Sequence, residues 1–192
     1  MKIYLIRHGQ TTGDIEDRYG GDYDDSLTQK GFEQVQELAK QLKDKEIEIF
    51  FTSSKLRALQ TTEILQNELG ASKVEMWDDL RERNRYGILS GMTKQEAKEK
   101  YPELVRKVED AKNTIQGAES YDQLVMRGKA MMNIILDTTY ETVGVVTHGG
   151  IIRMILKEML KTDAKKVEDC GYALLNYENY ELRLSSSQGI IL

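Results

Sequence analysis

The sequence predicts an α/β fold, a three-layer α/β/α sandwich in which helices cover both faces of a mostly parallel central sheet. Short apolar runs rich in β-branched residues alternate with longer segments of helical period, which is typical of parallel sheets. Two of these runs, residues 2–6 and 142–147, end alike, one in Arg7-His8-Gly9 and the other in His148-Gly149-Gly150. Ligands bind at the carboxyl ends of parallel strands, so we expect the chain's two histidines at one edge of the sheet.

The first half of the chain predicts three strands and two helices. We expect strands at residues 2–6, 47–51 and 74–77, and helices at 28–43 and 55–69. Thr28 can cap the first helix, and the hydroxyls of Thr52-Ser53-Ser54 are placed to cap the second. The segment 9–27 has no helical period, and its length and place after a buried strand favour a functional loop.

The second half opens with another polar loop, at residues 78–92. Capping-box patterns at Thr93–Glu96 and Ser120–Gln123 each predict the start of a helix. The expected helices run from 94 to about 101, onward from Pro102, and over 121–136 and 150–160. The expected strands are 142–147 and a closing pair, 173–177 and 180–184, with Glu178-Asn179 as a tight hairpin turn.

The composition narrows the class of protein. A formal net charge of -5 disfavours nonspecific binding to nucleic acid or to anionic membranes. No apolar run approaches the roughly 18–20 residues of a membrane span. Cys170 is the single cysteine, which excludes an internal disulfide and suits a reducing compartment. We therefore expect a cytoplasmic protein that binds neither nucleic acid nor membrane.

The residues expected at the strand ends suit an anion. They are Arg7 and His8, Arg57 one turn after the Thr-Ser junction, Glu82 in the second loop, and His148. Two guanidinium groups and the N–H groups of helix starts can bind a phosphate dianion. A histidine beside it can attack phosphorus or move a proton, and a carboxylate can protonate a leaving oxygen.

Other chemistries fit these residues less well. The two histidines with nearby acids could bind zinc or iron, but Arg7 is a poor neighbour for a divalent cation. The chain has no G-x-x-x-x-G-K-[ST] loop of an NTPase. A serine triad built on Ser53 or Ser54 with His148 lacks the G-x-S-x-G elbow.

Several short segments match known motifs in residue type and order. They are Arg7-His8-Gly9-Gln10-Thr11; Leu27-Thr28-Gln29-Lys30-Gly31 with Gln34; Thr52-Ser53 with Arg57-Ala58-Leu59-Gln60-Thr61; Leu80-Arg81-Glu82-Arg83 with Gly87 and Gly91; Gly117 with Glu119-Ser120 and Arg127; and Val146-Thr147-His148-Gly149-Gly150. On these segments the sequence resembles the histidine phosphatase superfamily, phosphoglycerate mutase-like branch. The resemblance implies that family's fold in a single domain over residues 1–192, with a helical lid insertion at about 93–118.

The resemblance also implies roles for individual residues. His8 would form a phosphohistidine, Arg7, Arg57 and His148 would hold the phosphoryl oxygens, and Glu82 would serve as general acid and then general base. Further residues expected to bind the phosphate or the substrate are Gln10, Thr11, Gly149, Arg83 and Tyr86. The family implies no metal and no organic cofactor.

Two positions depart from the family pattern. Asp14 stands where the family often has an asparagine that donates to phosphate, and an ionised carboxylate cannot donate. The spacing from Glu82 to Gly87 is one residue longer than usual.

The activity expected from this resemblance is hydrolysis of a small phosphorylated metabolite. The alternative is a 2,3-bisphosphoglycerate-dependent phosphoglycerate mutase, disfavoured because residues 110–117 offer one cation, Lys112, and no proline. A noncatalytic phospho-ligand binding module is disfavoured because His8, Glu82 and His148 are all present. The oligomeric state stays open between a monomer and a homodimer.

The identity of the substrate is the least constrained feature. Arg81, Arg83 and Arg85 around Glu82 are consistent with an anionic or multiply phosphorylated substrate. They are equally consistent with solvated loop charges or salt-bridge partners of Asp78 and Asp79. The segments 14–25 and 94–116 are expected to form the lid that decides specificity.

Overall fold

The sheet is built from six strands in the order β3-β2-β4-β1-β5-β6. The structure is a computed structural model, and it describes residues 1–71, 73–110 and 113–192. The strands of this described part are β1 (Lys2–Arg7), β2 (Ile49–Ser53), β3 (Lys73–Trp77), β4 (Thr142–Thr147), β5 (Lys166–Glu178) and β6 (Glu181–Ile191). Strands β1 to β4 are mutually parallel, and β5 runs antiparallel to β1 and β6. The expected, mostly parallel sheet is confirmed.

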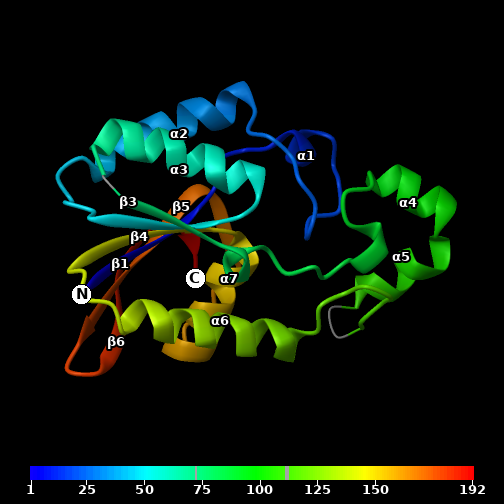
Figure 1. Cartoon of the computed structure of the whole chain (residues 1–192). Helices are drawn as coiled ribbons and strands as arrows, with labels where there is room; N and C mark the ends of the chain where they lie inside the picture. The colour runs from blue at the N-terminus through cyan, green and yellow to red at the C-terminus, as the bar shows by residue number, and fades with distance from the viewer. Residues whose placement is uncertain (72, 111–112) are drawn as a thin grey trace.

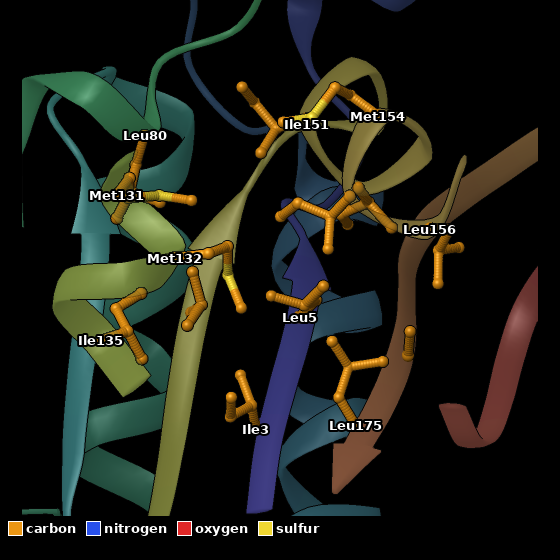
Figure 2. Packing of buried hydrophobic residues seen from close by; sticks show 14 of the residues in the cluster. Ile3, Leu5, Leu80, Met131, Met132, Ile135, Ile151, Met154, Leu156 and Leu175 are labelled. Atoms are coloured by element: carbon orange, nitrogen blue, oxygen red, sulfur yellow. The ribbon is translucent and has the colours of Figure 1, made fainter. Parts of the chain in front are cut away.

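Helices cover both faces of this sheet, as Figure 1 shows. Helices α2 (Gln29–Leu42) and α3 (Leu56–Leu69) lie on one face, and α6 (Tyr121–Leu136) and α7 (Gly149–Leu160) on the other. Successive strand residues point to opposite faces, so Leu5 packs with α6 and α7 whereas Ile6 packs with α2 and α3. Figure 2 shows Leu5 in the cluster that contains Met131 and Ile151. The expected three layers are therefore present.

A smaller helical segment lies beside these layers. It contains α4 (Lys94–Lys100) and α5 (Pro102–Glu109), seen to one side of the sheet in Figure 1. This segment has a buried apolar cluster of its own, formed by Leu89, Ala97, Val108 and Ile115. The short 3₁₀ helices η1 (Asp78–Leu80) and η2 (Gly87–Leu89) lie in the preceding loop. None of the helices in the described part of the chain is long and apolar enough to cross a membrane.

Two local expectations in the first half were wrong. The loop expected over 9–27 contains a one-turn helix, α1 (Thr12–Ile15), closed by a capping box between Thr11 and Asp14. The N-cap of helix α3 is Lys55, which makes no side-chain cap, and the Thr-Ser-Ser stretch contributes only the Ser53 hydroxyl, which accepts from the Lys55 N–H at 3.3 Å. The distant Asp24 instead accepts a hydrogen bond from the Leu56 N–H, at 2.9 Å.

The closing hairpin also differs from the expectation. Its turn is Asn179-Tyr180, not Glu178-Asn179, because Glu178 pairs with Glu181 and both turn residues have positive φ, 51° and 63°. Strand β5 begins at Lys166, seven residues earlier than expected. Its polar beginning hides the strand pattern, and a register shift between Val167 and Tyr172 interrupts the pairing with β6.

Candidate active site

The two histidines follow neighbouring strands at the same edge of the sheet. β1 pairs with β4 in a register that places Arg7 opposite Thr147, so His8 and His148 leave the sheet side by side. Their ring centroids are 5.1 Å apart, and the rings meet edge to face. Both side chains are buried. The structure thus brings together the pair that the sequence places at one edge.

Arg57 joins the two imidazoles. It is the second residue of α3, directly after β2, and its side chain is buried. Its Nε donates to Nε2 of His8 at 3.2 Å and to Nδ1 of His148 at 3.3 Å. Each of these ring nitrogens must therefore present a lone pair to the guanidinium.

The outer nitrogens of the two rings fix the tautomers. Nδ1 of His8 lies 2.8 Å from the Gly9 carbonyl oxygen, which can only accept, so Nδ1 carries the proton. Nε2 of His148 lies 2.9 Å from Oγ of Ser53 and donates to it. His8 is consequently held with an unprotonated Nε2, the form in which an imidazole can act as a nucleophile.

The surroundings keep both rings neutral. Burial first, and then the positive charges of Arg57 and Arg7, lower the pKa of His8 well below its ordinary value of 6.5. Burial, followed by the charge of Arg57, lowers the pKa of His148 in the same direction. Neutral imidazoles are thus the forms present at pH 7.

Each of the two guanidinium groups forms an ion pair with a carboxylate. Arg57 Nη1 lies 2.8 Å from Asp25 and donates to the Tyr23 carbonyl at 2.9 Å. Arg7 Nη2 lies 3.0 Å from Asp169, and Arg7 Nη1 donates to the carbonyl of Val167. These bonds hold each guanidinium in one orientation at the strand ends.

Glu82 lies over the start of helix α7. Its Oε2 accepts from the Gly150 N–H at 3.0 Å, and its Oε1 accepts from the Arg83 N–H at 2.8 Å. A Cβ at position 150 would come within 2.3 Å of Oε1, so the carboxylate can occupy this place only beside a glycine. Gly150 is two residues from His148, which puts Glu82 next to the histidine pair.

Arg127 fastens the loop that carries Glu82. It forms an ion pair with Glu119 at 2.8 Å and donates to the carbonyl oxygens of Asp79 and Arg81. The Gly117–Arg127 stretch identified in the sequence thus acts on the position of Glu82 from helix α6.

The other sequence-predicted residues divide into two groups. Near the histidines, the Gln10 side chain accepts from Thr28 at 3.0 Å, Thr11 caps α1, and Gly149 opens α7. Asp14 is engaged within the chain, because it accepts from the N–H and hydroxyl of Thr11 at 2.9 Å. Its other oxygen is 3.7 Å from Arg7. The carboxylate of Asp14, which stands where the family often has an asparagine, therefore has partners within the chain for both of its oxygens.

Arg83 and Tyr86 belong to the second group, which lines a cavity of about 870 Å³ rather than the histidine pair. Glu82 and Gly150 form one border of this cavity. Glu82 thus lies between the histidine pair and the cavity and borders both. In the described part of the chain, no group of three or more His, Cys, Asp and Glu side chains is arranged to hold a metal ion.

Comparison with known proteins places this site in a family. The model of the histidine phosphatase superfamily (branch 1) matches residues 3–189. The chain belongs to the histidine phosphatase superfamily. The resemblance found in the sequence is therefore confirmed.

Relatives within the superfamily carry both phosphatase and mutase names. The chain is 34% identical to phosphoglycerate mutase-like protein 4 of Arabidopsis thaliana, over 87% of this chain and 74% of that protein. It is also 34% identical to a metal-independent phosphoserine phosphatase of the same plant, over 80% of this chain and 66% of the relative.

Solved structures share the fold. The α-ribazole phosphatase of Shigella flexneri superposes with a TM-score of 0.87 at 19% identity, over 100% of this chain and 98% of the other. A mycobacterial glucosyl-3-phosphoglycerate phosphatase gives 0.80 at 22% identity, over 96% and 97%.

Several residues of this site were not predicted from the sequence. Asp25 stands in an aspartate-rich loop, which was the available signal for a partner of Arg57. Asp169 reaches Arg7 only because β5 packs along β1, and nothing local in the sequence indicates that contact. Arg153 and Lys157, which line the cavity, look in the sequence like ordinary surface charges of a helix.

Proposed function

We propose that the protein is a phosphomonoesterase that hydrolyses a small phosphorylated metabolite through a phosphohistidine on His8. The observation that carries the proposal is the unprotonated Nε2 of His8, aimed at the guanidinium of Arg57 at 3.2 Å. A nucleophile directed at a fixed cation is the arrangement that a phosphoryl group between them requires.

In the first step, Nε2 of His8 forms a bond to phosphorus while the bond from phosphorus to the ester oxygen breaks. Arg7 and Arg57 bind phosphoryl oxygens, so substrate binding exchanges the Arg57–His8 hydrogen bond for one to phosphate. His148 becomes a third donor by taking a proton from solvent onto Nδ1, which the bound dianion favours. Glu82, protonated at this stage, gives its proton to the leaving alkoxide.

In the second step, ionised Glu82 takes a proton from water and the resulting hydroxide attacks phosphorus. The P–N bond breaks, inorganic phosphate leaves, and His8 returns to its neutral form. Two guanidinium groups supply the positive charge that the transition state needs, so the proposed reaction requires no metal. Activity that survives prolonged treatment with EDTA is the corresponding expectation.

The helical segment at 93–118 fits the role of a lid over the cavity. Thr114 of this segment lines the cavity together with Arg85 and Tyr86 of the preceding loop. Arg18 and Thr93 form an isolated β-bridge between this segment and the 9–27 segment. The two segments would thus close the site together. Residues 111 and 112 of the lid, including Lys112, lie outside the described residues.

The test follows from the chain having only two histidines. After acid-free quenching, wild-type protein turning over a labelled aryl phosphate should carry phosphate that is stable in base and labile in acid. His8→Ala should lose the label and at least about a thousandfold in kcat, because its nucleophile is absent. His148→Ala should turn over slowly yet keep the label. A label that persists in His8→Ala, or near-normal turnover by that variant, would overturn the proposal.

The reaction products distinguish a phosphatase from a phosphoglycerate mutase. Incubation with 3-phosphoglycerate and catalytic 2,3-bisphosphoglycerate should release inorganic phosphate or leave the substrate intact. Interconversion of 3- and 2-phosphoglycerate that outpaces phosphate release would assign a mutase instead.

A further inference from the structure

Strand β5 is irregular where it passes the end of β1. Its pairing with β6 shifts register between Val167 and Tyr172, and Cys170 within this bulge has a positive φ of 57°. The bulge is closely packed against β6, since a Cβ at Gly171 would come within 2.7 Å of the Gly189 carbonyl oxygen. The shape of the bulge therefore depends on both strands of the closing hairpin.

The bulge contacts the catalytic end of β1 at three points. Two of them are on Arg7, whose Nη1 donates to the Val167 carbonyl oxygen at 2.6 Å and whose Nη2 lies 3.0 Å from the Asp169 carboxylate. At the third, the Cys170 N–H donates to the His8 carbonyl oxygen at 3.1 Å. Bulges re-aim side chains relative to a regular strand, and this one brings a carboxylate to Arg7.

Arg7 faces more negative charge than it carries. Asp169 and Asp14 lie 3.0 and 3.7 Å from the same nitrogen, Nη2. Burial raises the pKa of Asp169 above its ordinary value of 3.8, the charge of Arg7 opposes that effect, and the charge of Asp14 adds to it. Two carboxylates thus share one guanidinium.

The second arginine of the site is neutralised differently. Arg57 pairs with one carboxylate, that of Asp25, at 2.8 Å, and both side chains are almost wholly buried. The fold requires this pair, because either charge would be costly to bury alone. Arg7 is more accessible, and Asp14 and a backbone carbonyl oxygen contact it as well. The charge of Asp169 is thus in excess of what neutralising Arg7 requires.

We propose that Asp169 is a counter-ion that weakens the binding of inorganic phosphate at Arg7 and so favours release of the product. The inference rests on the proposed function, in which Arg7 binds the phosphoryl oxygens. A carboxylate beside Nη2 repels the phosphate dianion and competes with it for the donors of the guanidinium. Phosphate that is held less tightly leaves sooner, so the enzyme turns over at phosphate concentrations that would otherwise occupy the site.

Asp169→Asn tests the role of this charge. The variant removes the negative charge but keeps an oxygen that can accept from Arg7. We expect the inhibition constant of inorganic phosphate, measured against an aryl phosphate, to fall at least about threefold. Damage to the site would weaken phosphate binding, so a gain in affinity reports the loss of the charge and not a loss of structure.

Glu168→Gln provides the matched control. Glu168 is the adjacent residue, it is exposed, and it pairs with Lys166 at 3.5 Å. Because solvent screens an exposed charge, its removal should change the inhibition constant by less than about twofold. If Asp169→Asn is recovered unfolded, Asp169→Ser carries the same test, since water can fill the vacated space and accept from Arg7.

Calorimetric titration with inorganic phosphate measures the same affinity without turnover, and it separates this inference from the proposed function. Phosphate that binds the Asp169 variant no more tightly than the natural chain, or an equal gain in Glu168→Gln, would overturn the counter-ion role. A label on His8 in the same preparation would leave the proposed function standing. Tighter phosphate binding by Asp169→Asn without any label on His8 would support the counter-ion role and reject the phosphohistidine mechanism.

Discussion

At the scale of single residues, the site depends on one N–H shared between two rings. The single Nε–H of Arg57 donates to both rings, at 3.2 Å to Nε2 of His8 and at 3.3 Å to Nδ1 of His148, so the hydrogen bond is bifurcated. The arrangement is stable only while both imidazoles are neutral, since a protonated ring would present a positive charge to the guanidinium. Folding therefore works against protonation of both histidines.

This coupling predicts how stability depends on pH. Both histidines have a pKa well below 6.5 when folded, because of burial and then Arg57, whereas in the unfolded chain they titrate near 6.5. Below that pH the unfolded chain binds more protons, so the free energy of unfolding should fall as pH decreases. The limiting slope is about 1.4 kcal/mol per pH unit for each histidine.

Urea unfolding at pH 7.0 and 5.5 measures this effect. The double variant His8→Asn/His148→Asn lacks both groups and should show a shallower pH dependence over that interval than the natural chain. Carboxylates paired in the folded state contribute to both proteins alike and cancel in the comparison. Equal slopes for the two proteins would contradict the assignment of neutral, buried histidines.

At the scale of elements, helix α7 supplies the site with more than His148. Its first turn offers the Gly150 N–H that Glu82 accepts, and the missing side chain at Gly150 provides the room for the carboxylate. The loop of Glu82 is fastened in turn to α6 by Arg127. The position of the candidate acid is thus set by two helices that are distant from it in sequence.

Gly150→Ala should separate activity from stability. The new Cβ would lie 2.3 Å from Oε1 of Glu82, and the flexible carboxylate would have to move. Alanine also favours a helix over glycine by roughly 1 kcal/mol, so the melting temperature should stay level or rise. We expect kcat to fall at least about tenfold, a loss of about 1.4 kcal/mol in the transition state.

Gly149→Ala provides the matched comparison for that experiment. Its Cβ would meet the aliphatic Cδ of Arg7 at 3.7 Å, an ordinary contact. Its effect on kcat should therefore be clearly smaller than that of Gly150→Ala. Wild-type turnover by Gly150→Ala would show that Glu82 does not act from its observed place.

At the scale of the whole molecule, what could be predicted from sequence follows the range of the interactions. The α/β class was predictable because strand and helix periods are local, and His8 and His148 were predictable as neighbours because they directly follow parallel strands. The contact between Asp169 and Arg7 was not, because it depends on how β5 pairs with β1.

The same reason explains the errors in detail. Helix α3 is capped by Asp24, 32 residues before Leu56, although nearer hydroxyls satisfy the local rule. Among the arginines of the second loop, the sequence left open whether Arg81, Arg83 and Arg85 bind substrate or neighbouring acids. The structure divides them, because Asp78 reaches Arg81 and no described carboxylate forms an ion pair with the other two.

The molecule as a whole has cores of unequal size, and this predicts where it opens first. Two clusters hold the sheet between its helices, whereas the satellite cluster of Leu89, Ala97, Val108 and Ile115 holds α4 and α5. Small cores of few buried residues open at a lower free-energy cost than the global core. The α4–α5 segment should therefore unfold locally before the sheet does.

Leu89→Ala tests this order of opening. Leu89 is fully buried, and its truncation should lower the free energy of unfolding by about 2–5 kcal/mol. That loss is larger than so small a cluster can bear and remain folded. Hydrogen exchange followed by mass spectrometry should show faster exchange over 94–109 with little change in the strands. Leu5→Ala, an equally buried leucine in the main core, should instead speed exchange throughout the sheet. Uniform acceleration in Leu89→Ala would mean that the segment is part of one cooperative unit, and it would then be unable to open and close over the cavity on its own.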